Sequence, residues 1–177
     1  MNYAVIRRRA VGNLPLLLTR GVQIEARIAK LGYKLPAAPP EPKGSYMNYT
    51  RVGSVVHLCG HLPQPADGAL MAGRLGQDYS IEDGQKAARF AALQMLASLK
   101  SACGGDLDRV RKVIKIVGFV NSTTDFTSQH LVMNGCSDFM VEVFGIEIGR
   151  HARSALGTSV LPLGVPVEIE GIFEITE

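Results

Sequence analysis

The amino-acid sequence predicts one α+β domain: a mixed β-sheet with two helices on one face, preceded by an N-terminal extension. Three observations support this fold class. Segments with strand and helix periodicity follow one another in the order β-β-α-β-α-β-β. The 177 residues suffice for one hydrophobic core and are too few for two ordinary domains. Hydrophobic residues make up 46% of the chain and charged residues 20%, which is typical of a globular protein.

The first segment, residues 1–21, is expected to be a mitochondrial targeting segment or a disordered tail. It has no acidic residue, is partly apolar, and contains Arg7, Arg8, Arg9 and Arg20. These traits are typical of mitochondrial transit peptides, and a frayed tail without function is the alternative. Residues 22–177 are predicted to form the single domain. The expected location is therefore mitochondrial, or otherwise cytoplasmic.

A short helix and a proline-rich connector lead into this domain. Gln23–Leu31 has apolar residues on one helical face, and Gly32 would end the helix. Leu35–Pro42 contains four prolines, which exclude both a helix and a central strand. The extension therefore ends in an extended connector.

The domain itself opens with a predicted hairpin. Tyr49–Leu58 is rich in β-branched residues, and Gly53-Ser54 divides it into two strands. The following segment, Leu62–Gly76, contains prolines and glycines throughout and is predicted to be a loop.

Ser80–Ala102 is the clearest helix in the sequence. Ser80 and Asp83 match a capping box at its start, and Gly104-Gly105 would end it. One helical face carries a narrow, alanine-rich stripe made of Ala88, Ala91, Ala92, Met95, Leu96 and Leu99. This stripe predicts a helix that lies close against a sheet, as part of the core rather than as a cofactor groove.

The second half of the domain alternates between strands and one helix. Val110–Val120 is a predicted strand, and Thr127–Phe144 is a predicted helix broken at Asn134-Gly135. Ala155–Leu161 and Val167–Ile175 are predicted strands, and the last one alternates well between two faces.

Two charged residues near the last strands are candidates for chemistry. If these two strands pair as a hairpin, Arg153 and Glu168 lie near the same end of the sheet. Arginine presents a fixed fork of donors that matches a carboxylate. The glutamate could neutralise that arginine or hold a water molecule, so the residues alone leave a structural ion pair open as the alternative.

Two segments resemble the Rid family, also called the YjgF-like or L-PSP proteins. Gly44–Pro63 reads GSYMNYTRVGSVVHLCGHLP and is similar to the N-terminal pattern of that family. His151–Glu168 reads HARSALGTSVLPLGVPVE and is similar to the C-terminal pattern. The resemblance extends from about residue 40 to the C-terminus, in spacing as well as in residue type.

This resemblance implies a chorismate-mutase-like fold and a homotrimer with ligand clefts between subunits. It implies that Arg153 binds the carboxylate of a 2-imino acid and that Glu168 positions or activates a water molecule. The water would attack the C=N carbon and release ammonia and a 2-keto acid, which makes the expected enzyme an imine or enamine deaminase. Further residues implied in substrate binding are Tyr46, Gly60 and Asn134. Neither a metal nor an organic cofactor is required.

The sequence also departs from the family pattern. His61 replaces the usual glutamine after Gly60 and could line the cleft. Cys59 stands where serine is common, and Ala155 stands where some members have cysteine. These changes, together with the extension, indicate a longer subgroup and bear on the choice of substrate.

Two other functions remain open from the sequence. One is a non-catalytic trimeric module that binds a small carboxylate, and the other is RNA cleavage. The first 24 residues hold four of the 19 basic residues and none of the 16 acidic ones, which leaves 15 and 16 and a balance of −1. A near-neutral domain lacks the footprint of a nucleic-acid binder. No apolar run is long enough to span a membrane, and the three cysteines show no metal-ligand spacing.

Overall fold

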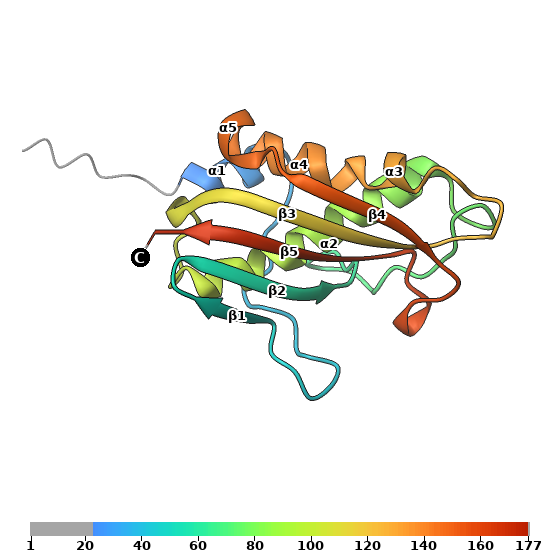
Figure 1. The fold of residues 1–177 in the computed structure, drawn as a ribbon, viewed down its shortest axis with the longest axis horizontal. Coiled ribbons are helices and arrows are strands. Elements are labelled where there is room, and N and C mark those ends of the chain that lie inside the picture. Colours follow the sequence, from blue (N-terminus) through green and yellow to red (C-terminus); the bar gives the residue numbers. More distant parts are fainter. Residues whose placement is uncertain (1–22, 177) are drawn as a thin grey trace, which may run out of the picture.

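A computed structural model describes residues 23–176 of the chain (Figure 1). The expected targeting segment lies outside these described residues. The fold is α+β, as the sequence predicts, and it consists of one five-stranded sheet with a layer of helices behind it. The strands are β1 (Tyr49–Val52), β2 (Val55–His61), β3 (Val110–Asn121), β4 (Ala152–Thr158) and β5 (Val167–Ile175).

The strand order in the sheet is β1-β2-β5-β3-β4. Every neighbouring pair is antiparallel except β3 and β4, which run parallel. The last two strands do not pair as the hairpin considered from the sequence, because β3 lies between β4 and β5. Strand β4 also begins three residues earlier than predicted, at Ala152, since its pairing with β3 begins at Lys115 and Ala152.

The helical layer is built around α2 (Ile81–Ala102), which packs on β2 and β5. The capping box predicted at its start is present, because Ser80 Oγ accepts from the Asp83 N–H and the Asp83 carboxylate accepts from the Ser80 N–H. Ala88, Ala91 and Ala92 are fully buried, so α2 approaches the sheet closely.

The second predicted helix is divided into α3 (Gln129–Val132) and α4 (Asn134–Phe144), followed by the unpredicted short α5 (Ile146–Gly149). The break falls at Met133, one residue before the predicted position. Met133 packs directly over β3, because a Cβ added to Gly118 would overlap the Met133 sulfur. The junction of the two helices thus covers the middle of the sheet.

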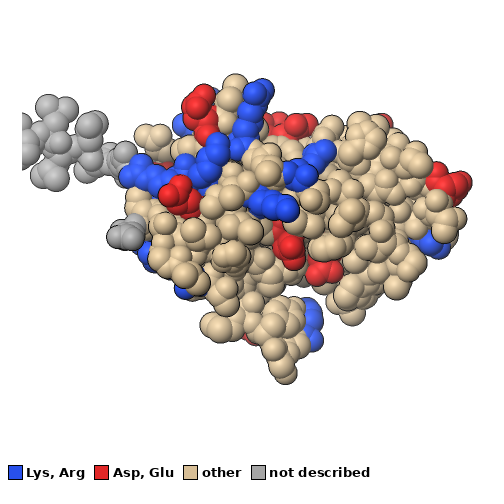
Figure 2. Space-filling model, viewed as in Figure 1, with Lys and Arg blue, Asp and Glu red and all other residues tan. Residues whose placement is uncertain are grey.

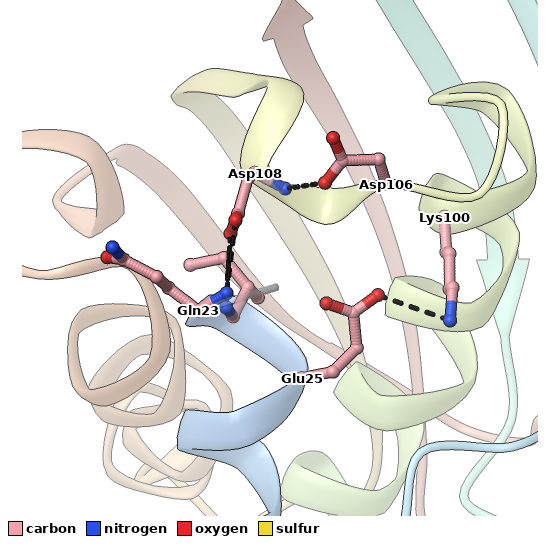
Figure 3. Close-up of polar contacts among 6 residues, drawn as sticks. Gln23, Glu25, Lys100, Asp106 and Asp108 are labelled. Carbon is pink, nitrogen blue, oxygen red and sulfur yellow. Dashed lines mark hydrogen bonds and ion pairs between the residues drawn. The ribbon is translucent and has the colours of Figure 1, made fainter. Parts of the chain in front are cut away.

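The N-terminal extension docks against the body of the domain through α1 (Gln23–Lys30) (Figure 3). The Asp108 carboxylate accepts hydrogen bonds from the Gln23 N–H at 3.0 Å and from the Ile24 N–H at 3.1 Å. These are donors that the first turn of a helix leaves without partners. A Glu25–Lys100 ion pair of 3.1 Å ties α1 to α2, and Ile24 and Ile28 are buried in the core. The extension is therefore part of the domain.

The segment between α1 and β1, residues 35–48, is termed the strap. It contains no helix or strand, in agreement with the predicted connector. The Asn48 side-chain amide donates to the Pro40 carbonyl at 2.7 Å, which holds the strap in a fixed shape.

The face of the sheet opposite the helices is uncovered in the described part of the chain. In Figure 1 the helices lie behind the strands, so the uncovered face is turned toward the viewer. Figure 2 shows the same view, in which uncharged side chains dominate and Lys and Arg gather mainly near α1 and α5.

Candidate functional site

A cleft of about 900 Å³ opens between the strap, the end of β2 and the turn before β5. Most of its walls are apolar, and Glu168 is one of only three charged residues that border it. Its lining includes Pro36, Pro40, Tyr46, Cys59, Gly60, His61, Leu62, Pro65, Leu70, Pro162, Leu163 and Glu168. The cleft therefore brings together four of the six residues that the sequence singled out: Tyr46, Gly60, His61 and Glu168.

Glu168 projects from β5 toward the uncovered face, beside the backbone of Gly60. A Cβ added to Gly60 would overlap the Glu168 carboxylate, so only glycine leaves room for the acid in this position. Burial raises the pKa of Glu168, and the neighbouring Glu170 raises it further. A carboxylate with a raised pKa accepts and returns a proton more readily near neutral pH, which suits general acid–base chemistry.

An irregularity in β2 carries Gly60 to this position. The pairing of β2 with β5 shifts between Leu58 and His61, so that Cys59 and Gly60 form a bulge. The Cys59 N–H donates to the Asn48 carbonyl at 3.0 Å, which ties the bulge to the strap. The bulge thus turns the backbone of Gly60 toward the cleft.

His61 connects the bulge to helix α2. Its Nδ1 lies 2.8 Å from the Cys59 carbonyl and its Nε2 lies 2.7 Å from Ser98 Oγ on α2. The ring is 1% exposed, and burial lowers the pKa of His61 to about 4, so it is neutral at pH 7. His61 therefore borders the cleft, as expected from the sequence, while both of its ring nitrogens are occupied by partners within the chain.

Arg153 lies outside this cleft, on β4. Arg153 pairs with Ile116 of β3, whose side chain is buried under the helices, whereas Glu168 pairs with Phe119 of β3. Positions 116 and 119 are an odd number of residues apart, so Arg153 and Glu168 project from opposite faces of the sheet. The hairpin on which their proximity depended does not form, and within one chain the two side chains lie on opposite faces of the sheet.

The Arg153 guanidinium is held by uncharged groups. Nη1 donates to Asn134 Oδ1 and to Ser137 Oγ, both at 3.0 Å, and Nη2 donates to the His130 carbonyl, also at 3.0 Å. None of the ion pairs among residues 23–176 includes Arg153. The side chain is therefore oriented while its charge is not neutralised, and two of its five N–H groups have no acceptor in the described chain.

Ser137 and His151 extend this network and were not singled out as site residues by the sequence. Ser137 Oγ lies 3.1 Å from His151 Nε2, and His151 Nδ1 lies 2.7 Å from the Gly149 carbonyl. The carbonyl requires a proton on Nδ1, so Nε2 accepts from Ser137. Burial lowers the pKa of His151, which keeps the ring in this neutral form. The sequence signals for this cluster were Asn134, which the family resemblance implied, and the position of His151 two residues before Arg153.

Neither cluster is arranged as a metal site. Within residues 23–176, no three His, Cys, Asp or Glu side chains are grouped so that they could hold a metal ion. None of the helices described in the structure is long and apolar enough to cross a membrane.

Residues 25–170 match a family described as "YjgF/chorismate_mutase-like, putative endoribonuclease". The chain belongs to this YjgF-like family. Among curated proteins, TCP17 of Trypanosoma cruzi is 44% identical over 153 residues, which cover 86% of this chain and 94% of TCP17.

Solved structures of YjgF-like proteins have the same fold. Atu1372 of Agrobacterium tumefaciens, described as having unknown function, is 40% identical, with a TM-score of 0.79, over 87% of this chain and 94% of that one. A "putative endoribonuclease" of Shewanella oneidensis MR-1 is 32% identical, with a TM-score of 0.81, over 86% of this chain and 99% of that one. The YjgF-like fold expected from the sequence is confirmed.

Proposed function

We propose that this YjgF-like protein hydrolyses small 2-imino acids and enamines to 2-keto acids and ammonia, in a site shared between two copies of the chain. The observation that carries the proposal is the Arg153 guanidinium, which is oriented by three uncharged acceptors and keeps its charge. Such a group is suited to bind a carboxylate from outside the chain through its remaining donors. The family resemblance assigns Arg153 the same task.

The separation of Arg153 from Glu168 supports a shared site. Each belongs to a cluster that lacks the other: Glu168 has a cleft without an arginine, and Arg153 has an oriented charge without a nearby acid. If a second copy places its edge strand β4 against the cleft, its Arg153 lies near Glu168 of the first copy. The two clusters then form one site. A closed ring of three copies is the assembly that the family resemblance implies.

The reaction needs only orientation and one group that moves a proton. Arg153 binds the substrate carboxylate. A water molecule beside Glu168 loses a proton to the Glu168 carboxylate and adds through its oxygen to the imine carbon. The protonated Glu168 returns this proton to the nitrogen, which gives a carbinolamine. Glu168 then takes the hydroxyl proton of the carbinolamine and transfers it to the nitrogen, so that the C–N bond breaks and ammonia leaves as the C=O bond forms. Orientation and one acid–base group suffice for a substrate that already hydrolyses readily.

The test is the hydrolysis rate of freshly generated 2-iminopropanoate, measured with wild type, Arg153→Ala, Glu168→Gln and the control Arg111→Ala, which removes an exposed arginine of β3. We expect wild type and Arg111→Ala to accelerate formation of the keto acid and both site variants to lose the acceleration. An unchanged rate in Arg153→Ala would contradict the proposal. If carboxylates raise the melting temperature without any turnover, the protein is a binding module instead.

RNA cleavage is a third candidate function, and the same variants test it when they are incubated with RNA. RNA binding requires a basic surface, whereas the domain is nearly neutral and the lining of the cleft is mainly apolar. Both observations argue against RNA cleavage. RNA cleavage activity that co-purifies with the chain and disappears in Glu168→Gln would favour this function.

For residues 1–21 we propose mitochondrial targeting. The test is a fluorescent protein fused to these residues, and a fusion that stays in the cytosol would contradict the proposal.

A further inference from the structure

We propose that the cleft selects substrates that carry a bulky apolar side chain, of the size found in leucine, methionine or phenylalanine. The inference rests on the proposed function, because it names the substrate class for that site. Its evidence is separate, however: it comes from the walls of the cleft rather than from Arg153.

The cleft is larger, and its walls are more apolar, than the binding of a small imino acid requires. Glu168 lies at one side, and the only other charged residues in the lining, Glu41 and Lys43, are exposed on the strap. The remaining surface is dominated by proline and leucine side chains, namely Pro36, Pro40, Leu62, Pro65, Leu70, Pro162 and Leu163. Burying an apolar side chain against these walls is favourable roughly in proportion to the area removed from water.

Internal hydrogen bonds hold the walls in place. Asn48 fixes the strap through the Pro40 carbonyl, and the buried Gln94 of α2 donates to the Gln64 carbonyl at 2.7 Å, which fixes the loop after β2. The Gly73 N–H donates to the Gly164 carbonyl at 2.9 Å and fixes the turn before β5. The apolar volume is thus built before a ligand arrives, as is usual for small-molecule sites.

Leu163 gives the most specific indication. It has a φ of 58° and is the single non-glycine residue with positive φ in the described chain. Its side chain borders the cleft and is 62% exposed. A large apolar residue in the left-handed region is unfavourable, and such strain persists where it serves a function. We assign Leu163 to contact with the apolar side chain of the substrate.

The experiment compares imines derived from alanine, leucine and phenylalanine with wild type, Leu163→Asn and Ile146→Asn. Asparagine is close to leucine in size and tolerates positive φ, so Leu163→Asn removes the apolar contact without adding backbone strain. Ile146 is an exposed apolar residue of α5 away from the cleft and serves as the control. For wild type and Ile146→Asn we expect kcat/KM at least about tenfold higher for the leucine-derived imine than for the alanine-derived one. In Leu163→Asn this preference should fall severalfold.

Binding of 2-keto acids distinguishes a failure of this inference from a failure of the proposed function. Calorimetry with pyruvate and 4-methyl-2-oxopentanoate measures the preference for side chains without requiring turnover. A wild-type preference for the larger acid that Leu163→Asn weakens supports the inference even if no imine is hydrolysed. Equal affinities and equal turnover for small and large side chains would overturn it.

Discussion

Arg153 and Glu168 project from opposite faces of one sheet, with β3 between the strands that carry them. If two copies share each site, two inactive variants should complement each other. Mixing equal amounts of Arg153→Ala and Glu168→Gln, with unfolding and refolding to exchange subunits, should restore activity at about one quarter of the sites. The measurement is the imine-hydrolysis rate of the mixture against each variant alone. A mixture as inactive as its components, although gel filtration shows mixed assemblies, would exclude a shared site.

A second prediction concerns the close approach of Gly60 to Glu168. Gly60→Ala places a methyl group where the carboxylate lies, so the acid must move. A displacement of roughly 1 Å at a reacting group can cost about 100-fold in rate, and we expect a loss of this order in kcat/KM. Cys59→Ala, in the same bulge, is the matched control and should retain most activity. Full activity of Gly60→Ala at an unchanged melting temperature would show that the position of Glu168 is not critical.

The third prediction is a pH dependence of stability that arises from His61. The ordinary pKa is 6.5, and burial lowers the pKa of the folded chain to about 4. The unfolded chain therefore gains a proton first as the pH falls, so stability is full above pH 6.5 and declines between pH 6.5 and 4. Below pH 4, protonation of His61 alone lowers the free energy of unfolding by about 3 kcal/mol.

Denaturant unfolding at several pH values measures this loss. His61→Gln should flatten the curve between pH 6.5 and 4, whereas His57→Gln, an exposed residue of the same strand, should not. His151, whose pKa is also lowered, contributes in the same direction in all three proteins. Identical pH curves for wild type and His61→Gln would mean that His61 is not buried as a neutral ring.

The fourth prediction tests how the N-terminal extension is attached. Asp108→Ala removes the acceptor of two N–H groups in the first turn of α1 (Figure 3). Losing a helix cap costs about 1 kcal/mol, which corresponds to a fall of about 2–4 °C in melting temperature for a domain of this size. Hydrogen exchange at Gln23 and Ile24 should accelerate as well. Asp67→Ala, which breaks an exposed ion pair with Lys34, is the control and should change stability little.

Local signals in the sequence predicted the elements of this fold well, and long-range pairing was the part they missed. The capping box at Ser80 and the alanine stripe of α2 involve neighbours within a few residues, so periodicity reveals them. The insertion of β5 between β2 and β3 depends on which surfaces pack together in the whole domain. Strands β4 and β5 follow one another in the chain, which favours a hairpin between them, but β3 pairs with both of them instead.

The same distinction applies to the site. Glu168, Gly60 and Tyr46 border one cleft, and Asn134 lies against Arg153, so the residues named by the family resemblance fall into two clusters. The environment of His61 could not be predicted, because its partner Ser98 is 37 residues away on α2. Ser137 and His151 were missed as a pair for a similar reason, since their contact depends on how α4 packs beside β4.

The placement of the two charged residues on different faces has a consequence for the newly made chain. If two copies share each site, a single copy holds only the two separate halves of the proposed catalytic site. Activity per molecule should therefore fall on dilution more steeply than the amount of folded protein does, so that concentration itself acts as a control on when the chemistry begins.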